Sequence, residues 1–68
     1  MSFDRLEYVI AIAEEQSITK AADRLYISQP ALTASINKLE AELGVKLFDR
    51  QRPPVKLTPA GALYIKEM

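Results

Sequence analysis

Residues 28–44, SQPALTASINKLEAELG, are the segment that most limits how this chain can fold. Ser28 is a good N-cap because its hydroxyl can accept a first-turn amide, and Pro30 is tolerated because first-turn amides lack intrahelical partners. Gly44 favours the positive φ that ends a helix. The apolar residues between these signals recur at helical spacing on one side: Leu32, Ile36, Leu39 and Leu43. The segment therefore predicts one helix with a buried stripe.

The opposite side of this helix carries residue types that a core does not need. Opposite the stripe lie Pro30, Ala34, Asn37 and Ala41, flanked by Thr33 and Lys38, with Gln29 at the free N-terminal end. A Gln side chain can hydrogen-bond an adenine edge bidentately, Thr can touch a thymine methyl, and Pro and Ala leave room for close approach. The amides beside Ser28 suit a phosphate. This side predicts contact with DNA, although polar outer faces also occur throughout small helical proteins.

A short helix is expected directly before this segment. Residues 18–25 carry apolar side chains at positions i, i+3, i+4 and i+7, and Ser17 or Thr19 is available as the N-cap. Only Tyr26 and Ile27 separate this helix from the next N-cap. Two helices joined by so short a turn match a helix-turn-helix, in which the second helix enters the major groove of DNA.

The first helix, expected over residues 3–15, has two apolar strips rather than one. One strip forms a core face. The second consists of Tyr8, Ala11 and Ile12, and a surface helix needs only one such strip. The second strip therefore predicts a further packing partner, which is either a later helix of this chain or a second copy of the protein.

Residues 46–57 predict a small two-stranded hairpin with a basic tip. The segments KLFD and VKL are short and rich in strand-forming residues, and RQRPP lies between them. Pro53 and Pro54 do not fit inside a strand ladder, so they belong to the loop. Arg50 and Arg52 are then placed to contact backbone phosphates, although a few basic loop residues are more often a solvated surface.

A further helix is expected after the hairpin. Thr58 is its N-cap and Pro59 its first residue, and the pattern stays helical to Met68. The apolar residues of this helix are Leu63, Tyr64 and Ile65.

The composition argues against several classes of site. The 68 residues hold no Cys and no His, which removes the thiol nucleophile, the commonest general base and the commonest metal ligand. We therefore expect no catalytic residue, no metal site and no enzyme. No apolar run approaches the roughly 20 residues that span a bilayer, and a signal-peptide pattern is absent, so we expect a cytoplasmic protein with no membrane partner. The net charge is zero, but residues 45–56 hold four basic residues against one acidic residue.

The combination of AADRL, SQPALTASINKLEAELGVKLFDR and LTPAG resembles the N-terminal domain of LysR-type transcriptional regulators along essentially the whole chain. The resemblance implies a mainly α, winged helix-turn-helix fold with a three-helix core, a two-stranded β wing and the start of a linker helix. We expect the winged helix-turn-helix DNA-binding domain over residues 1–57. Residues 58–68 are expected to be the N-terminal part of the linker, or dimerisation, helix, here truncated.

The resemblance also implies roles for individual residues. Those that read the major groove are Gln29, Pro30 and Thr33, and those of the wing are Arg50, Arg52 and Pro53. The other candidate DNA-binding residues are Ser28, Ala34, Asn37 and Lys38. The residues expected to pack the linker helix on the first helix and on its partner in a dimer are Tyr8, Ala11, Ile12, Leu63 and Tyr64.

The chain departs from the family pattern on the second helix of the helix-turn-helix. Family members commonly carry Arg at the position of Ala34, Gln at that of Ser35 and a basic residue at that of Asn37. We therefore expect weaker charged contacts from this helix, with Lys38 compensating in part.

The implied partner is double-stranded DNA with an inverted-repeat operator, bound by a homodimer of the full-length bacterial regulator. The 68-residue chain on its own is expected to be a monomer or a weak dimer. No cofactor is expected here, and a small-molecule effector is implied only for a separate C-terminal domain. The alternative is a winged helix that binds a protein through the same face, which the neutral net charge favours slightly.

Overall fold

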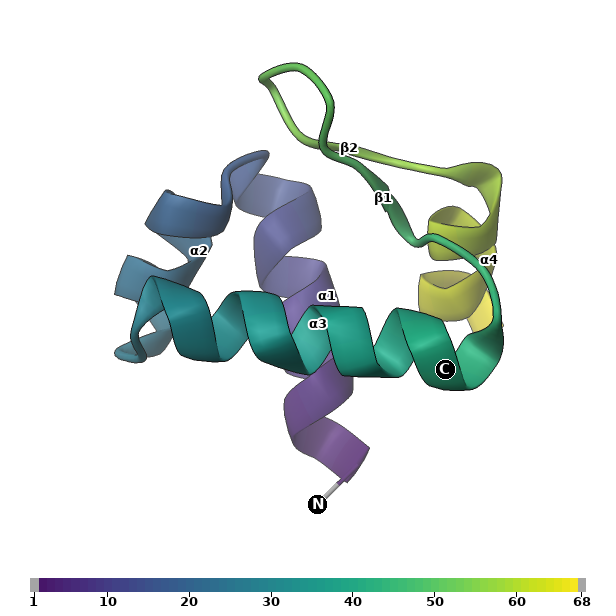
Figure 1. The fold of residues 1–68 in the computed structure, drawn as a ribbon, viewed down its shortest axis with the longest axis horizontal. Helices are drawn as coiled ribbons and strands as arrows, with labels where there is room; N and C mark the ends of the chain where they lie inside the picture. The colour runs from purple at the N-terminus through teal and green to yellow at the C-terminus, as the bar shows by residue number, and fades with distance from the viewer. Residues whose placement is uncertain (1, 68) are drawn as a thin grey trace.

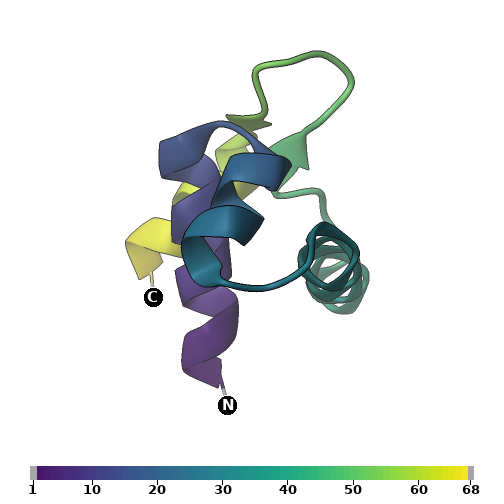
Figure 2. The same cartoon turned by 90° about the vertical axis from the view of Figure 1, so that its left-hand side faces the viewer.

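Four helices and one two-stranded antiparallel sheet make up residues 2–67, the part of the chain that the computed structural model describes, with side chains described from residue 5 onward. In chain order the elements are α1 (Ser2–Glu15), α2 (Ile18–Leu25), α3 (Gln29–Leu43), β1 (Phe48–Asp49), β2 (Lys56–Leu57) and α4 (Pro59–Glu67). α1 lies at the centre and packs against α2, α3 and α4 (Figure 1). The loop of the hairpin extends beyond the helices (Figure 2). This arrangement confirms the predicted winged helix-turn-helix.

Capping side chains set the starts of α2, α3 and α4 as predicted. The hydroxyls of Ser17, Ser28 and Thr58 accept first-turn N–H groups at 3.1, 3.2 and 3.0 Å. Ser17 is therefore the cap of α2, and Thr19 is not. Gly44 ends α3 with a φ of 73°. Because these contacts satisfy amides that a helix end leaves without partners, the helix boundaries follow from local sequence.

The core lies where α1, α2 and α3 meet. Its buried apolar side chains are Val9, Ala11, Ile12, Ala21, Ala22, Leu32, Ile36, Leu39, Leu47 and Phe48. Two of the largest, Leu32 and Ile36, come from the stripe of α3 and are fully buried. Burying a large aliphatic side chain contributes about 1.5–3 kcal/mol, so this stripe fixes which side of α3 faces inward.

The stripe of α3 departs from the prediction at its C-terminal end. Leu43, which was expected to be buried, is 45% exposed. Glu40 is buried instead, because the segment leading into β1 returns to α3 on the side of Glu40 and bonds to its carboxylate. The buried face of α3 therefore changes from apolar to acidic where the helix meets the hairpin.

The second apolar strip of α1 is covered within the chain. Ala11 and Ile12 are buried in the core, and Tyr8 is half-buried against it. α4 packs on α1, with Tyr64 half-buried and Leu63 56% exposed. The sequence leaves two partners open for this strip, a later helix of this chain or a second copy. Ala11 and Ile12 are buried inside the domain, so these two residues offer no surface to a second copy.

Close packing joins α4 to the hairpin. Phe48 of β1 lies opposite Leu57 of β2, and the N–H of Thr58 donates to the carbonyl of Leu47 at 3.0 Å. A Cβ placed on Gly61 would overlap the Leu47 carbonyl oxygen and lie 2.8 Å from Leu57 Cδ2. The glycine of the LTPAG motif is thus required by the approach of another backbone segment.

Substituting Gly61 with alanine is expected to destabilise the fold by about 1–3 kcal/mol, because the added methyl group must displace the backbone at Leu47. Urea unfolding followed by circular dichroism measures the change in the free energy of unfolding. Ala62→Ser, at an exposed position of the same helix, is the control and is expected to change it by no more than about 0.5 kcal/mol. Equally small effects of both substitutions would contradict the close approach of α4.

Candidate nucleic-acid interface

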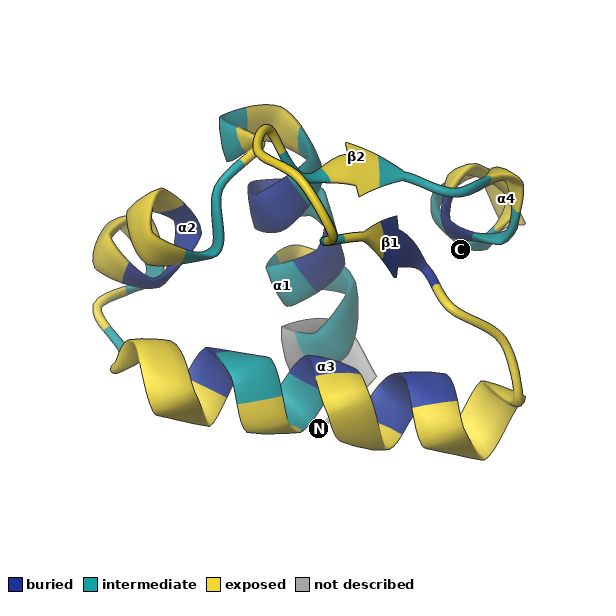
Figure 3. Cartoon of the chain, turned by 45° about the horizontal axis from the view of Figure 1, so that its top comes forward, coloured by how far each residue is buried: buried dark blue, intermediate teal, exposed yellow. Residues whose placement is uncertain are grey.

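The outward side of α3 is exposed along its N-terminal half, as the sequence predicts. The exposed residues are Ser28, Gln29, Pro30, Ala34, Asn37 and Lys38, and Thr33 is half-buried. Figure 3 shows exposed surface along the side of α3 that is turned away from the other helices. At a rise of 1.5 Å per residue, Gln29 and Lys38 lie about 14 Å apart along the axis. This candidate surface is therefore open to a partner.

Gln29 is held by a contact that the sequence analysis missed. The Thr19 hydroxyl donates to Gln29 Oε1 at 3.2 Å, which joins the first turn of α2 to the first turn of α3. The bond leaves the NH₂ group of Gln29 and one lone pair of Oε1 for a further ligand. Because the contact depends on how the two helices cross, the only signal in the sequence is a hydroxyl residue near the start of α2.

The hairpin separates the two arginines that were predicted to act together. Arg52 and Pro53 are exposed on the loop between β1 and β2. Arg50 instead turns back toward α3, where its Nη2 donates to Glu40 Oε1 at 2.5 Å and its side chain is 24% exposed. The structure therefore keeps Arg52 at the tip and gives Arg50 a structural contact that the prediction lacked.

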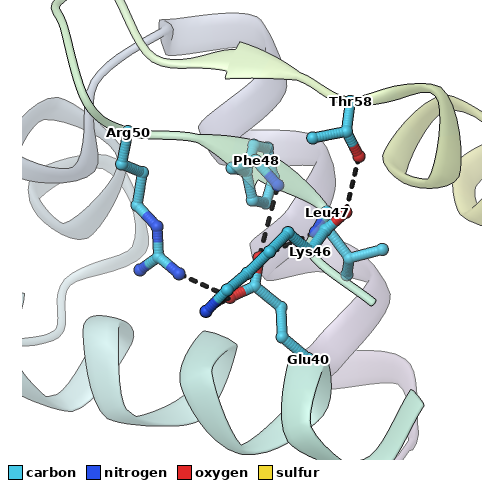
Figure 4. Close-up of polar contacts among 6 residues, drawn as sticks. All are labelled: Glu40, Lys46, Leu47, Phe48, Arg50 and Thr58. Carbon is cyan, nitrogen blue, oxygen red and sulfur yellow. Dashed lines mark hydrogen bonds and ion pairs between the residues drawn. The ribbon is translucent and has the colours of Figure 1, made fainter. Parts of the chain in front are cut away.

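The Glu40 carboxylate accepts several hydrogen bonds from the residues that follow α3 (Figure 4). Its Oε2 accepts the N–H groups of Leu47 at 2.7 Å and Phe48 at 3.3 Å, while its Oε1 accepts the Arg50 guanidinium. The Lys46 ammonium lies 3.9 Å from Oε1. Sequence analysis missed Glu40, and its position beside the apolar stripe was the one available signal.

The segment that leads into β2 is attached to a different part of the domain. The N–H of Val55 donates to the Gln16 carbonyl, at the junction of α1 and α2, at 3.1 Å. Residues 51–54, between this anchor and Arg50, are all exposed. The tip of the hairpin therefore projects from two anchored ends.

Ion pairs within the chain neutralise part of its positive charge. The basic residues whose nitrogens lie within 3.9 Å of a carboxylate are Arg5, Arg24, Lys46 and Arg50. Arg5 joins α1 to α3 through hydrogen bonds that lower the pKa of Glu42. The exposed Lys38 and Arg52 make no such pair with any described residue. A net charge of zero therefore coexists with unneutralised cations at the candidate surface.

Two kinds of site are absent from the described residues. Among the side chains of residues 5–67, no cluster of acidic, cysteine or histidine residues is placed to hold a metal ion. Within residues 2–67, no helix has both the length and the apolar character needed to cross a membrane.

Comparison with known sequences gives one family. The family described as "Bacterial regulatory helix-turn-helix protein, lysR family" matches residues 3–62. The HTH-type transcriptional regulator BenM of Acinetobacter baylyi is 50% identical over 64 residues, which are 94% of this chain and 21% of BenM. ClcR of Pseudomonas putida is 49% identical over 67 residues, 98% of this chain and 23% of ClcR. The chain thus spans about a fifth of the length of these relatives.

Solved structures give the same fold. The crystal structure of the BenM_DBD/catB site 1 DNA complex matches with a TM-score of 0.91 and 48% identity, covering 98% of this chain and 75% of that one. The CbnR_DBD–DNA complex matches with a TM-score of 0.89 and 42% identity, covering 98% and 77%. The curated relatives are named as transcriptional regulators, which agrees with the prediction that this chain is not an enzyme.

Proposed function

This chain belongs to the lysR family of bacterial regulatory helix-turn-helix proteins, and from that premise we propose that it binds double-stranded DNA sequence-specifically, as part of a transcription regulator. The observation that carries the proposal is the exposed outward side of α3 beside a hairpin with Arg52 at its tip. The similar BenM and CbnR domains were both crystallised with DNA. In this proposal residues 1–57 are the DNA-binding domain and residues 58–68 begin the linker helix.

α3 enters the major groove with its N-terminal half. The groove is about 12 Å wide and admits one α-helix. Gln29 pairs with an adenine edge and Thr33 meets a thymine methyl, while Pro30 and Ala34 allow the helix to come close to the bases. Gln29, Pro30 and Ala34 are exposed, Thr33 is half-buried, and no aromatic side chain lies among them, which supports this placement.

Other residues hold the phosphate backbone. The amides that follow Ser28 at the start of α3 receive one phosphate, and Lys38 and Asn37 reach the backbone that flanks the groove. Arg52, with Pro53 beside it, contacts a phosphate from the tip of the hairpin. The support is that Lys38 and Arg52 are exposed cations without an ion pair to any described residue.

The complete regulator works as a dimer on an inverted-repeat operator. α4 begins the linker helix that pairs with its counterpart, and its exposed Leu63 supports this assignment. Tyr8 and Tyr64 are half-buried against the core and pack the linker helix on the domain. A separate C-terminal domain, in the length that the relatives have beyond this chain, binds a small-molecule effector.

The experiment that tests the function is selection of bound sites from random duplex DNA, followed by a salt titration of fluorescence anisotropy on a selected and a scrambled duplex. We expect an enriched motif and tighter binding to the selected duplex. Binding should weaken linearly with the logarithm of the salt concentration. No enrichment, together with no salt-dependent binding, would contradict the proposal and favour a protein partner for the same face.

Gln29→Ala is expected to cost about 1–3 kcal/mol on the selected duplex and to relax the preference at one base pair. Thr19→Val should weaken binding by acting through Gln29, so the double variant should bind no worse than Gln29→Ala alone. Anisotropy measured on duplexes changed one base pair at a time gives both results. If the effects of the two substitutions simply add, Thr19 does not position Gln29.

Arg52→Ala is expected to weaken binding to the selected and the scrambled duplex by the same factor, because a phosphate contact carries no sequence information. The slope of log affinity against log salt should fall by about one unit. Lys66→Ala, near the end of α4, is the control and should leave the slope unchanged. A loss confined to the selected duplex would show that Arg52 reads bases instead.

Leu63→Asp is expected to abolish whatever self-association the wild-type chain shows at high concentration, because it places a charge on the exposed apolar side of α4. Sedimentation velocity across a series of protein concentrations measures the association. The circular dichroism spectrum should be unchanged, since Leu63 is 56% exposed in the single chain. Association that survives the substitution would place the dimer contact elsewhere.

A further inference from the structure

Glu40 is buried to 3% exposure, although it carries a charge. A buried carboxylate without hydrogen-bond partners strongly destabilises a fold, so its burial requires donors. Those donors are the N–H groups of Leu47 and Phe48 and the guanidinium of Arg50, at 2.7, 3.3 and 2.5 Å. All three belong to the first leg of the hairpin. The carboxylate therefore connects α3 to the hairpin and does little for α3 itself.

The chemistry at this position suits a carboxylate. Both oxygens of Glu40 accept, one from two neighbouring N–H groups and the other from Arg50. A glutamine would turn its NH₂ donor toward one of these two sets of donors and leave that set unpaired. Position 40 therefore requires two acceptor oxygens, because the hairpin directs hydrogen-bond donors at both of them.

We propose that Glu40 is a positioning residue for DNA binding, which holds Arg52 at a fixed place relative to the base-reading end of α3. The inference rests on the proposed function. Gln29 and Glu40 lie on one helix, about 16 Å apart along its axis. Arg50, held by Glu40, precedes Arg52 by two residues, and the Val55 contact with Gln16 at the α1–α2 junction fixes the far end of the tip. When α3 occupies the groove, this clamp brings Arg52 to the phosphates.

A purely structural role for Glu40 predicts a different result. It would lower the fraction of folded chain but leave unchanged the number of phosphates that each folded chain contacts. The charge of Glu40 alone also predicts a different result from the proposal. Glu40→Gln removes a negative charge, which by itself should strengthen binding to DNA, whereas the proposal predicts weaker binding. The slope of log affinity against log salt reports the number of phosphate contacts, so it separates these cases.

The test compares Glu40→Gln, Arg52→Ala and their double variant in the 68-residue chain, by anisotropy on a selected and a scrambled duplex. Glu42→Gln is the matched control, because it removes the same charge from the same helix and breaks only the Arg5 pair. We expect Glu40→Gln to lower the slope by about one unit, as Arg52→Ala does, with no further loss in the double variant. Glu42→Gln should keep the slope.

A further variant keeps the outcome decisive if Glu40→Gln folds poorly, and a further measurement on Glu40→Gln tests the contact itself. Arg50→Met removes only the guanidinium from the clamp, and it should lower the slope without adding to the effect of Arg52→Ala. Without DNA, hydrogen exchange at the Leu47 and Phe48 amides should become at least tenfold faster in Glu40→Gln than in the control. The inference would be overturned, with the proposed function intact, by a folded Glu40→Gln variant that keeps the original slope. It would be overturned in the same way if the slope losses of Glu40→Gln and Arg52→Ala added in the double variant. A wild-type chain that binds neither duplex would overturn the proposed function as well.

Discussion

The burial of Leu32 and Ile36 in the core shared with α1 and α2 is the contact on which the rest of the structure depends. Each side chain contributes about 1.5–3 kcal/mol by leaving water, and a rotation of α3 about its axis would expose both. Because the helical period is fixed, burying these two residues turns Pro30, Ala34 and Asn37 outward, while Gln29 is exposed because it lies at the free N-terminal end of the helix. The core therefore determines which side chains a partner can meet, without any contact to that partner.

The hairpin depends on its surroundings far more than the helices do. Its strands are two residues each, which is too short for a hairpin to be stable alone. Contacts from elsewhere in the domain hold it, among them the Glu40 carboxylate, the Gln16 carbonyl and the close approach of Gly61. These contacts come from α3, from the α1–α2 junction and from α4. The position of the tip therefore depends on how α3, α4 and the α1–α2 junction are packed together.

The sequence predicts the elements well because their signals are local. Capping hydroxyls at Ser17, Ser28 and Thr58 and the glycine at position 44 mark helix ends, and apolar spacing gives the inward side of α3. The interaction of Arg50 and the burial of Glu40 in place of Leu43 were not predictable in this way. They depend on where the chain returns after α3, which is a property of tertiary packing.

The pairing of Arg5, Arg24 and Arg50 with carboxylates has a consequence for how such a domain would search a genome. Non-specific attraction to DNA grows with the number of cations offered to phosphates, and a genome presents millions of competing sites. Cations that are paired with carboxylates of the protein add less to that background occupancy than free cations do. Under the proposed function, discrimination then depends on the uncharged side chains proposed to meet base edges, and a domain with few free cations spends less time on irrelevant sequence.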